Sequence, residues 1–123
     1  TNHLRVVFLW AGQMTVSTYI LDGTLLTGAA ATYGTAVPTL TKRVFRAMNL
    51  YNGTAAPVQC EVHLIASGGT ASDTNRVILR TLAVEETYTC PEVINEGLNA
   101  GGFVQALGLN CSLRFTATEQ TNS

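Results

Sequence analysis

Apolar and polar positions alternate along several short stretches of the chain, most regularly over residues 58–65. Every second residue is apolar, namely Val58, Cys60, Val62 and Leu64, and the residues between them are the polar Gln59, Glu61 and His63. Successive side chains of a β-strand point to opposite faces of its sheet. The pattern therefore predicts a strand with one buried and one solvated face, and it places His63 on the solvated face.

A second apolar stretch, residues 43–51, precedes the first, and Asn52-Gly53-Thr54-Ala55-Ala56 separates the two. Asparagine and glycine both tolerate the positive φ angles that tight turns require. We therefore expect residues 43–51 and 57–65 to pair as an antiparallel hairpin.

Further stretches are rich in β-branched and aromatic residues or alternate in the same way: 4–10, 15–20, 76–82, 86–90, 103–107 and 111–117. Pro91 suits the first position of a helix, so one short helical turn is expected near residues 91–98. Short strands with turn signals between them are typical of sandwiches and jelly rolls. The predicted fold class is all-β, a single-domain antiparallel β-sandwich or jelly roll of about eight strands.

The chain has 123 residues, which fits one domain. We expect residues 1–14 to form an N-terminal strand or arm, residues 15–118 the sandwich, and residues 119–123 a C-terminal tail. Residues 21–39 are rich in residues that interrupt regular elements: Gly23, Gly28, Gly34 and Pro38. This segment is expected to be a long loop, or an arm that lies on a neighbouring subunit.

Charged residues make up 12% of the chain, about half of the usual share in globular proteins. So low a charge indicates a surface that is largely covered by copies of the chain or by a larger assembly. A weakly charged, threonine-rich extracellular domain is the alternative. The formal net charge of −1 gives no electrostatic attraction for nucleic acid or anionic lipid. We expect no nucleic-acid or membrane partner, and synthesis in a cytoplasm, since no signal peptide is recognised.

The cysteines Cys60, Cys90 and Cys111 are widely spaced and lie in apolar stretches. Zinc sites use close cysteine pairs, and a disulfide framework uses an even number. We therefore expect buried free thiols. A bridge between one pair stays open, in case neighbouring strands carry the two residues.

The chain offers little catalytic chemistry. His3 and His63 are far apart in sequence, and neither lies beside a nucleophile motif. Glu85 and Glu86 are adjacent, so a strand would send them to opposite faces, and a polar turn before Tyr88 is the better interpretation. We predict a protein that is not an enzyme, with no catalytic, cofactor-binding or metal-binding residues and no cofactor.

Several segments nevertheless share a pattern with a known family. They are the strand, Asn-x-Thr turn and strand of residues 50–65, the loop of residues 67–76, the Leu82-Ala83-Val84-Glu85-Glu86-Thr87-Tyr88 step, and the glycine turn before Val104-Gln105-Ala106. In these features the chain resembles the small β-sandwich virion structural proteins of tailed bacteriophages. The resemblance covers about residues 15–118. It departs from the family at residues 4–10 and 21–39, which are longer than the usual short lead-in.

The resemblance implies a non-enzymatic structural protein of the virion that is made and assembled in the host cytoplasm. The implied function is that of a capsid decoration or cement protein, which binds between major capsid subunits and stabilises the head. Its partners would be copies of itself, as a homotrimer or homodimer, and the major capsid protein or other virion proteins. A tail or baseplate accessory protein is the alternative within the same class.

The candidate contact residues come from the two departing segments: Leu4, Val6, Phe8, Trp10, Leu25, Leu26 and Tyr33. Edge strands and arms can add to a neighbour's sheet through main-chain hydrogen bonds. A carbohydrate-binding sandwich that stacks sugars on Trp10 or Tyr33 is a further alternative from a different functional class.

Overall fold

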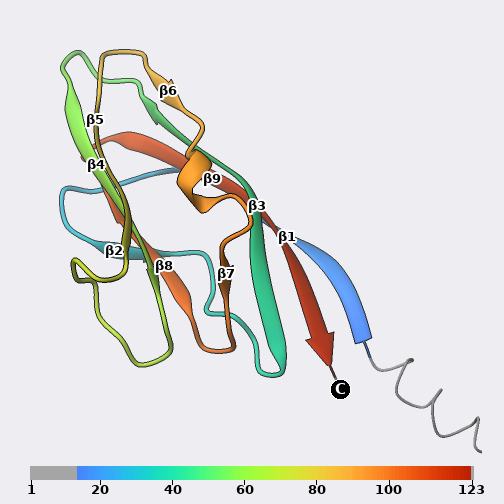
Figure 1. The fold of residues 1–123 in the computed structure, drawn as a ribbon. Helices are drawn as coiled ribbons and strands as arrows, with labels where there is room; N and C mark the ends of the chain where they lie inside the picture. Colours follow the sequence, from blue (N-terminus) through green and yellow to red (C-terminus); the bar gives the residue numbers. More distant parts are fainter. Residues whose placement is uncertain (1–13, 123) are drawn as a thin grey trace, which may run out of the picture.

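A computed structural model describes residues 14–122 of the chain. Two antiparallel sheets pack face to face over a shared core, so the predicted all-β sandwich is confirmed (Figure 1). Apolar residues at alternate positions of the strands supply the buried faces, as the period of two requires. The predicted strands at residues 4–10 lie outside the described residues.

The first sheet has the order β1-β9-β3-β6, and β7 also pairs with β3. Its strands are β1 (Met14–Leu25), β3 (Thr41–Asn52), β6 (Thr87–Tyr88), β7 (Gly97–Leu98) and β9 (Cys111–Asn122). The long strand β9 lies between β1 and β3 and pairs with each of them in antiparallel register. The first and last strands of the described chain therefore lie side by side.

The second sheet has the order β2-β8-β4-β5. Its strands are β2 (Ala31–Tyr33), β4 (Val58–Ile65), β5 (Arg76–Leu82) and β8 (Phe103–Leu107). The bounds of β5 and β8 coincide with the predicted strands at residues 76–82 and 103–107.

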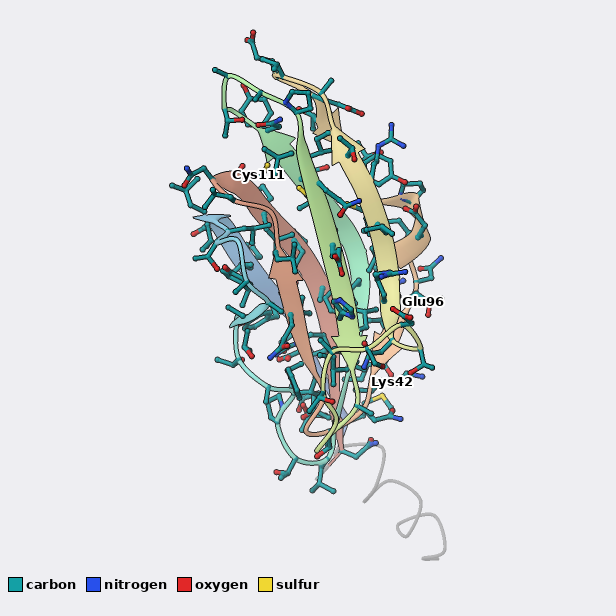
Figure 2. All side chains as sticks on the ribbon, turned by 90° about the vertical axis from the view of Figure 1, so that its left-hand side faces the viewer. Lys42, Glu96 and Cys111 are labelled. Carbon is teal, nitrogen blue, oxygen red and sulfur yellow. The ribbon has the colours of Figure 1, made fainter. Side chains whose placement is uncertain are left out.

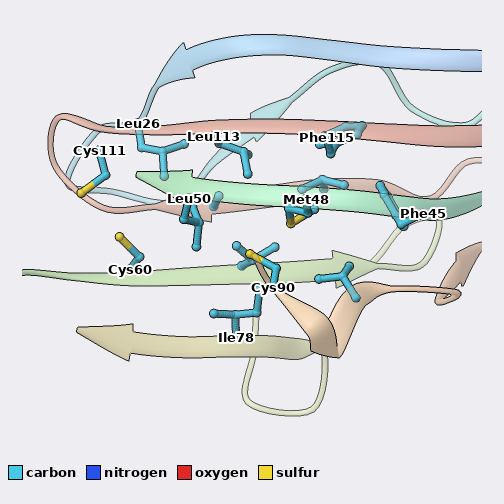
Figure 3. Close-up of a cluster of buried hydrophobic side chains, with 14 of the residues drawn as sticks. Leu26, Phe45, Met48, Leu50, Cys60, Ile78, Cys90, Cys111, Leu113 and Phe115 are labelled. Atoms are coloured by element: carbon cyan, nitrogen blue, oxygen red, sulfur yellow. The ribbon is translucent and has the colours of Figure 1, made fainter. Parts of the chain in front are cut away.

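The core between the sheets is made of side chains that both sheets bury. Phe45 and Phe115 meet edge to face, with ring centroids 5.2 Å apart, and Met48, Leu50 and Leu113 extend the same layer (Figure 3). An edge-to-face pair of this kind adds about 1 kcal/mol beyond the burial of its two rings. The core is continuous, which makes the two sheets one folding unit.

The predicted hairpin of residues 43–51 and 57–65 is wrong. Strand β3 belongs to the first sheet and β4 to the second, so the connection at residues 53–57 crosses between sheets. The side chain of Asn52 holds this crossing: it is fully buried and its amide nitrogen donates to the carbonyls of Ala56 and Leu82. Asparagine and glycine here support a change of sheet instead of a tight turn.

Three other boundaries differ from the sequence predictions. Strand β9 continues to Asn122, so residues 119–122 form strand instead of a tail, because they pair with both β1 and β3. The helical turn is limited to the 3₁₀ turn η1 (Pro91–Val93), after which β7 pairs with β3. The segment 21–39 contains the end of β1 and all of β2, which pairs with β8.

The predicted exposure of His63 is also wrong. The ladder between β4 and β5 shifts register between Val62 and His63, which is a β-bulge or a similar irregularity. After this shift His63 is 5% exposed and Ile65 is fully buried. Strand β4 keeps its register with β8 through Ile65, so His63 stays on the same face as Glu61 and is covered there by Asn75.

Candidate interaction surface

Within residues 14–122, strand β1 is the long open edge of the sandwich. It is 12 residues long and pairs with β9 on one side, and it stands at the end of the first sheet's strand order. An edge strand presents unpaired backbone N–H and C=O groups, to which another chain can add. Its sequence contains one charged residue, Asp22.

The other edges of the described sandwich are shorter or carry more charge. Strands β2, β6 and β7 have three, two and two residues. Strand β5 has seven residues, and these include Arg76 and Arg80. Short strands and charged side chains are the usual devices that prevent pairing between edges. Strand β1 has neither device over residues 14–21.

Four exposed side chains of β1 are large and apolar, and the polar residues Thr18 and Asp22 lie exposed among them. Met14, Val16, Ile20 and Leu25 are 53%, 60%, 55% and 64% exposed. We call these four residues the β1 face. The register places Val16 and Ile20 beside Gln120 and Thr116 of β9, so threonine and glutamine side chains border the β1 face. Strands of low charge with apolar outward residues are typical of sheets that pair with another chain.

The inward side of β1 is fixed to the sandwich through Tyr19. The guanidinium of Arg43 stacks 4.0 Å above the centroid of the Tyr19 ring, and the ring of Phe115 lies 6.0 Å from it. The Tyr19 hydroxyl also accepts a hydrogen bond of 2.8 Å from the backbone N–H of Thr35. These contacts hold the edge strand in place while its outward face stays exposed.

The candidate contact residues from the sequence are not gathered in one place. Leu4, Val6, Phe8 and Trp10 lie outside the described residues. Leu25 belongs to the β1 face, whereas Leu26 is 1% exposed and packs in the core of its own chain. The side chain of Leu26 is therefore unavailable to a partner. Tyr33 is half-buried against the core, which leaves little of its ring for a stacked sugar.

The register also places Leu25 and Tyr51 on either side of Ser112. Together with Gly53, Thr54 and Asn110 they line an open depression of about 430 Å³. This depression lies at the end of the sandwich marked by Cys111, opposite the end marked by Lys42 and Glu96 (Figure 2). It extends the β1 face by an aromatic side chain that is 39% exposed.

Polar groups inside the fold serve structural purposes. His63 Nδ1 lies 2.8 Å from Asn75 Oδ1, and His63 Nε2 lies 3.3 Å from Glu61 Oε1. Glu86 accepts a hydrogen bond from the backbone N–H of Ala83, and Glu85 has a φ of 62°, so these two residues form the predicted polar turn. Both interactions fix loops beside β4 and β5.

Residues 14–122 contain neither a candidate metal cluster nor a candidate membrane-spanning helix. No cluster of His, Cys, Asp and Glu in this range is arranged to hold a metal ion. The same residues include no helix with the length and apolar character that spanning a membrane demands.

Sequence reasoning missed Met14, Val16 and Ile20 as surface residues. The available signal was the absence of charge over residues 14–21, combined with alternation. That signal identifies a strand. The strand can be recognised as an interaction surface only when the strand order shows β1 at the edge of its sheet.

Comparison with solved structures finds likenesses of fold at low sequence identity. A solved chain of the Bacillus endospore appendages, described as a novel family of disulfide-linked pili, has a TM-score of 0.52 and 13% identity, over 89% of this chain and 88% of that chain. A chain of the infectious bursal disease virus T13 particle has a TM-score of 0.40 and 12% identity, over 89% of this chain and 31% of that chain. No protein-family model and no curated protein sequence matches the chain.

The first of these likenesses extends over nearly the whole of both chains, and it shows a common fold. The viral chain is about three times as long as the part that is matched.

Proposed function

We propose that this protein is a non-enzymatic structural subunit that assembles with copies of itself through strand β1. The observation that carries the proposal is the exposed, almost uncharged edge of β1 together with the apolar β1 face. An edge of 12 residues without charge over residues 14–21 would promote aggregation in a protein that works alone. In an assembling subunit the same edge supplies backbone hydrogen bonds and contact area.

The contact is heterologous when β1 of one copy meets a different edge of the next copy. Strand β5 is the second longest edge, and its Arg76 and Arg80 leave the exposed Leu79 between them. Heterologous contacts form rings where the rotation closes and filaments where it does not. The low overall charge of the chain allows many copies to pack without strong repulsion.

The particular assembly that we propose is a virion, in which the chain acts as a decoration or cement protein on the capsid. The resemblance of residues 15–118 to small virion proteins of tailed bacteriophages supports this assignment. Binding between major capsid subunits would stabilise the head by mass action, because only the assembled lattice presents the site. A tail accessory protein is the alternative within the virion.

A subunit of a filamentous surface appendage is the second candidate. The likeness to the endospore appendage chain, which covers 88% of that chain, favours it. In both candidates the protein acts by forming contacts with neighbouring subunits. They differ in whether the subunit polymerises with itself or binds to a capsid shell.

The first experiment measures the mass of the purified protein by light scattering and images it by negative-stain electron microscopy. Oligomers or filaments at micromolar concentration are expected. Val16→Lys and Ile20→Lys place a charge on the β1 face and should return the protein to monomers with unchanged circular dichroism. Val84→Lys is the matched control, because Val84 is 43% exposed in a turn away from β1.

The two candidates are separated by adding phage capsids that lack decoration. Binding to capsids without self-polymerisation supports the decoration protein, and filaments without added capsids support the appendage subunit. Deletion of residues 1–12 should abolish attachment and leave the fold intact, since these residues lead directly into β1. A monodisperse monomer that neither polymerises nor binds a shell would refute the assembling subunit.

A further inference from the structure

Two cysteine side chains face each other across the sandwich. Cys60 lies on β4 of the second sheet and Cys111 is the first residue of β9 in the first sheet. Figure 3 shows their side chains extending from the two sheets into the space between them at the same end of the sandwich. Both residues are fully buried as free thiols.

The turn between β8 and β9 brings the two thiols together. Cys111 donates its backbone N–H to the carbonyl of Gly108, at 2.9 Å, which closes the turn. Gly108 packs so closely on Cys60 that a Cβ atom at residue 108 would lie 2.6 Å from the Cys60 sulfur. The chain thus passes over Cys60 and returns into the other sheet with Cys111 above it.

We propose that Cys60 and Cys111 form a disulfide within the chain, which links the two sheets at this end of the sandwich. A disulfide requires Cβ vectors that point toward each other, and the two sheets supply that arrangement without a change of topology. The bridge closes a loop of about 50 residues, a length at which cross-links restrict the unfolded chain strongly. This inference is independent of the proposed assembly.

The reaction is thiol–disulfide exchange with a small-molecule disulfide. The thiolate of one cysteine attacks the oxidant's disulfide, so a mixed disulfide forms and one thiolate leaves. The second cysteine, as thiolate, then attacks the protein sulfur of the mixed disulfide and releases the second thiolate. The two cysteines lose two protons and two electrons, and the oxidant becomes two thiols.

Cys90 is the third thiol and could in principle pair with Cys60 or Cys111, but its surroundings argue against that pairing. Its sulfur donates to the backbone carbonyl of Tyr88 at 3.5 Å. Cys90 also lies on the connection between β6 and η1, in the left-handed conformation with a φ of 49°. Its side chain is therefore fixed by its own segment.

The folded protein should react slowly. Burial, and next the hydrogen bond with the Cys111 thiol, raise the pKa of the Cys60 thiol to about 12. The thiolate is the nucleophile in disulfide exchange, so a raised pKa reduces attack at neutral pH. Oxidation is expected while the chain folds, or when this end of the sandwich opens, and not in the closed reduced protein.

The test refolds the full chain from urea in a glutathione redox buffer and then alkylates all free thiols under denaturing conditions. Peptide mapping by mass spectrometry should find the Cys60 and Cys111 peptides linked, with Cys90 alkylated. A reductant should reverse the link. The oxidised protein should melt roughly 10 °C higher than the reduced protein.

Cys90→Ala is the matched control and should form the link as the wild type does. Cys60→Ala and Cys111→Ala should each abolish it, and circular dichroism under reductant shows whether these variants fold. If Cys60→Ala or Cys111→Ala fails to fold, peptide mapping of the wild type and of Cys90→Ala still shows whether Cys60 and Cys111 are linked. Three alkylated cysteines after oxidative refolding, a link to Cys90, or a link between chains would overturn the proposal.

Discussion

Arg43 and Glu119 face each other on β3 and β9, with Arg43 Nη2 2.7 Å from Glu119 Oε2. The Arg43 side chain is 1% exposed and the Glu119 side chain 13%. Arg43 also donates to the carbonyl of Thr35 at 2.8 Å and stacks on Tyr19 of β1. One buried cation therefore connects β3, β9 and the edge strand β1.

Glu119→Ala should lower the free energy of unfolding by about 3 kcal/mol, because it leaves the buried guanidinium without its charged partner. Urea denaturation followed by fluorescence measures this loss. Glu96→Ala is the control, since Glu96 is exposed, and it should change stability by less than about 0.5 kcal/mol. Equal effects of the two substitutions would contradict a structural role for the pair.

Asn52 holds the connection between the two sheets. Its amide nitrogen donates to two carbonyls, and its Oδ1 accepts from the backbone N–H of Thr54 at 2.9 Å and from the Thr54 hydroxyl at 2.7 Å. Asn52→Ala should destabilise the fold by about 2–3 kcal/mol, because it leaves buried polar groups without hydrogen-bond partners. Asn49→Ala, at a half-buried position of the same strand, should have a much smaller effect in the same denaturation experiment.

Gly108 combines a φ of 152° with a close approach to Cys60. Gly108→Ala should cost about 2 kcal/mol, since the new methyl group must displace the Cys60 sulfur and the backbone conformation disfavours a side chain. The control is Gly28→Ala, where a Cβ atom meets nothing within 4 Å. If the two variants had the same melting temperature, the turn would tolerate a side chain at residue 108.

Tyr88 provides a prediction on pH. Its hydroxyl donates to Glu92, whose two carboxylate oxygens lie 2.7 and 2.6 Å away. This hydrogen bond, and next burial, raise the pKa of Tyr88 to about 12. Because the unfolded value is about 10, the contribution to stability is complete below pH 10 and is lost as the pH rises toward 12.

Glu92→Gln should therefore bring the pKa of Tyr88 back toward 10. A spectrophotometric titration of tyrosinate absorbance, taken as the difference between wild type and variant, isolates this one residue. Glu85→Gln should leave the curve unchanged. Identical titrations of the wild type and Glu92→Gln would show that the hydrogen bond does not form in solution.

The local sequence pattern predicted those strands whose position does not depend on distant partners. The bounds of β5 and β8 followed from β-branched and apolar residues between clear turn signals. The short β6 also lies inside its predicted range, and Glu85 and Glu86 form the expected turn.

Features that depend on distant partners could not be predicted in this way. The residues Asn52 and Gly53 are compatible with a hairpin, and the change of sheet becomes visible only when the buried amide of Asn52 is seen to bind Leu82 of β5. The buried position of His63 depends on Asn75, which precedes β5 and lies 2.8 Å from the histidine ring, and nothing within the sequence of β4 marks this contact.

The candidate interaction surface depends on strand order even more strongly. The sequence gives β1 its apolar residues, but nothing in it says that β9 lies between β1 and β3. Leu25 and Leu26 are adjacent leucines with similar local patterns, yet one is exposed and the other is in the core. Leu26 turns inward because its backbone N–H binds the carbonyl of Cys111 where β1 ends.

The pairing of β1 with β9 has a consequence for the order of events during synthesis. Within the described residues β1 joins its sheet through β9 alone, and Met14 pairs with Asn122. The edge proposed for assembly therefore cannot take its final form until β9 has left the ribosome. Contacts between such distant residues form late in folding, so this edge is completed only after β9 has been synthesised.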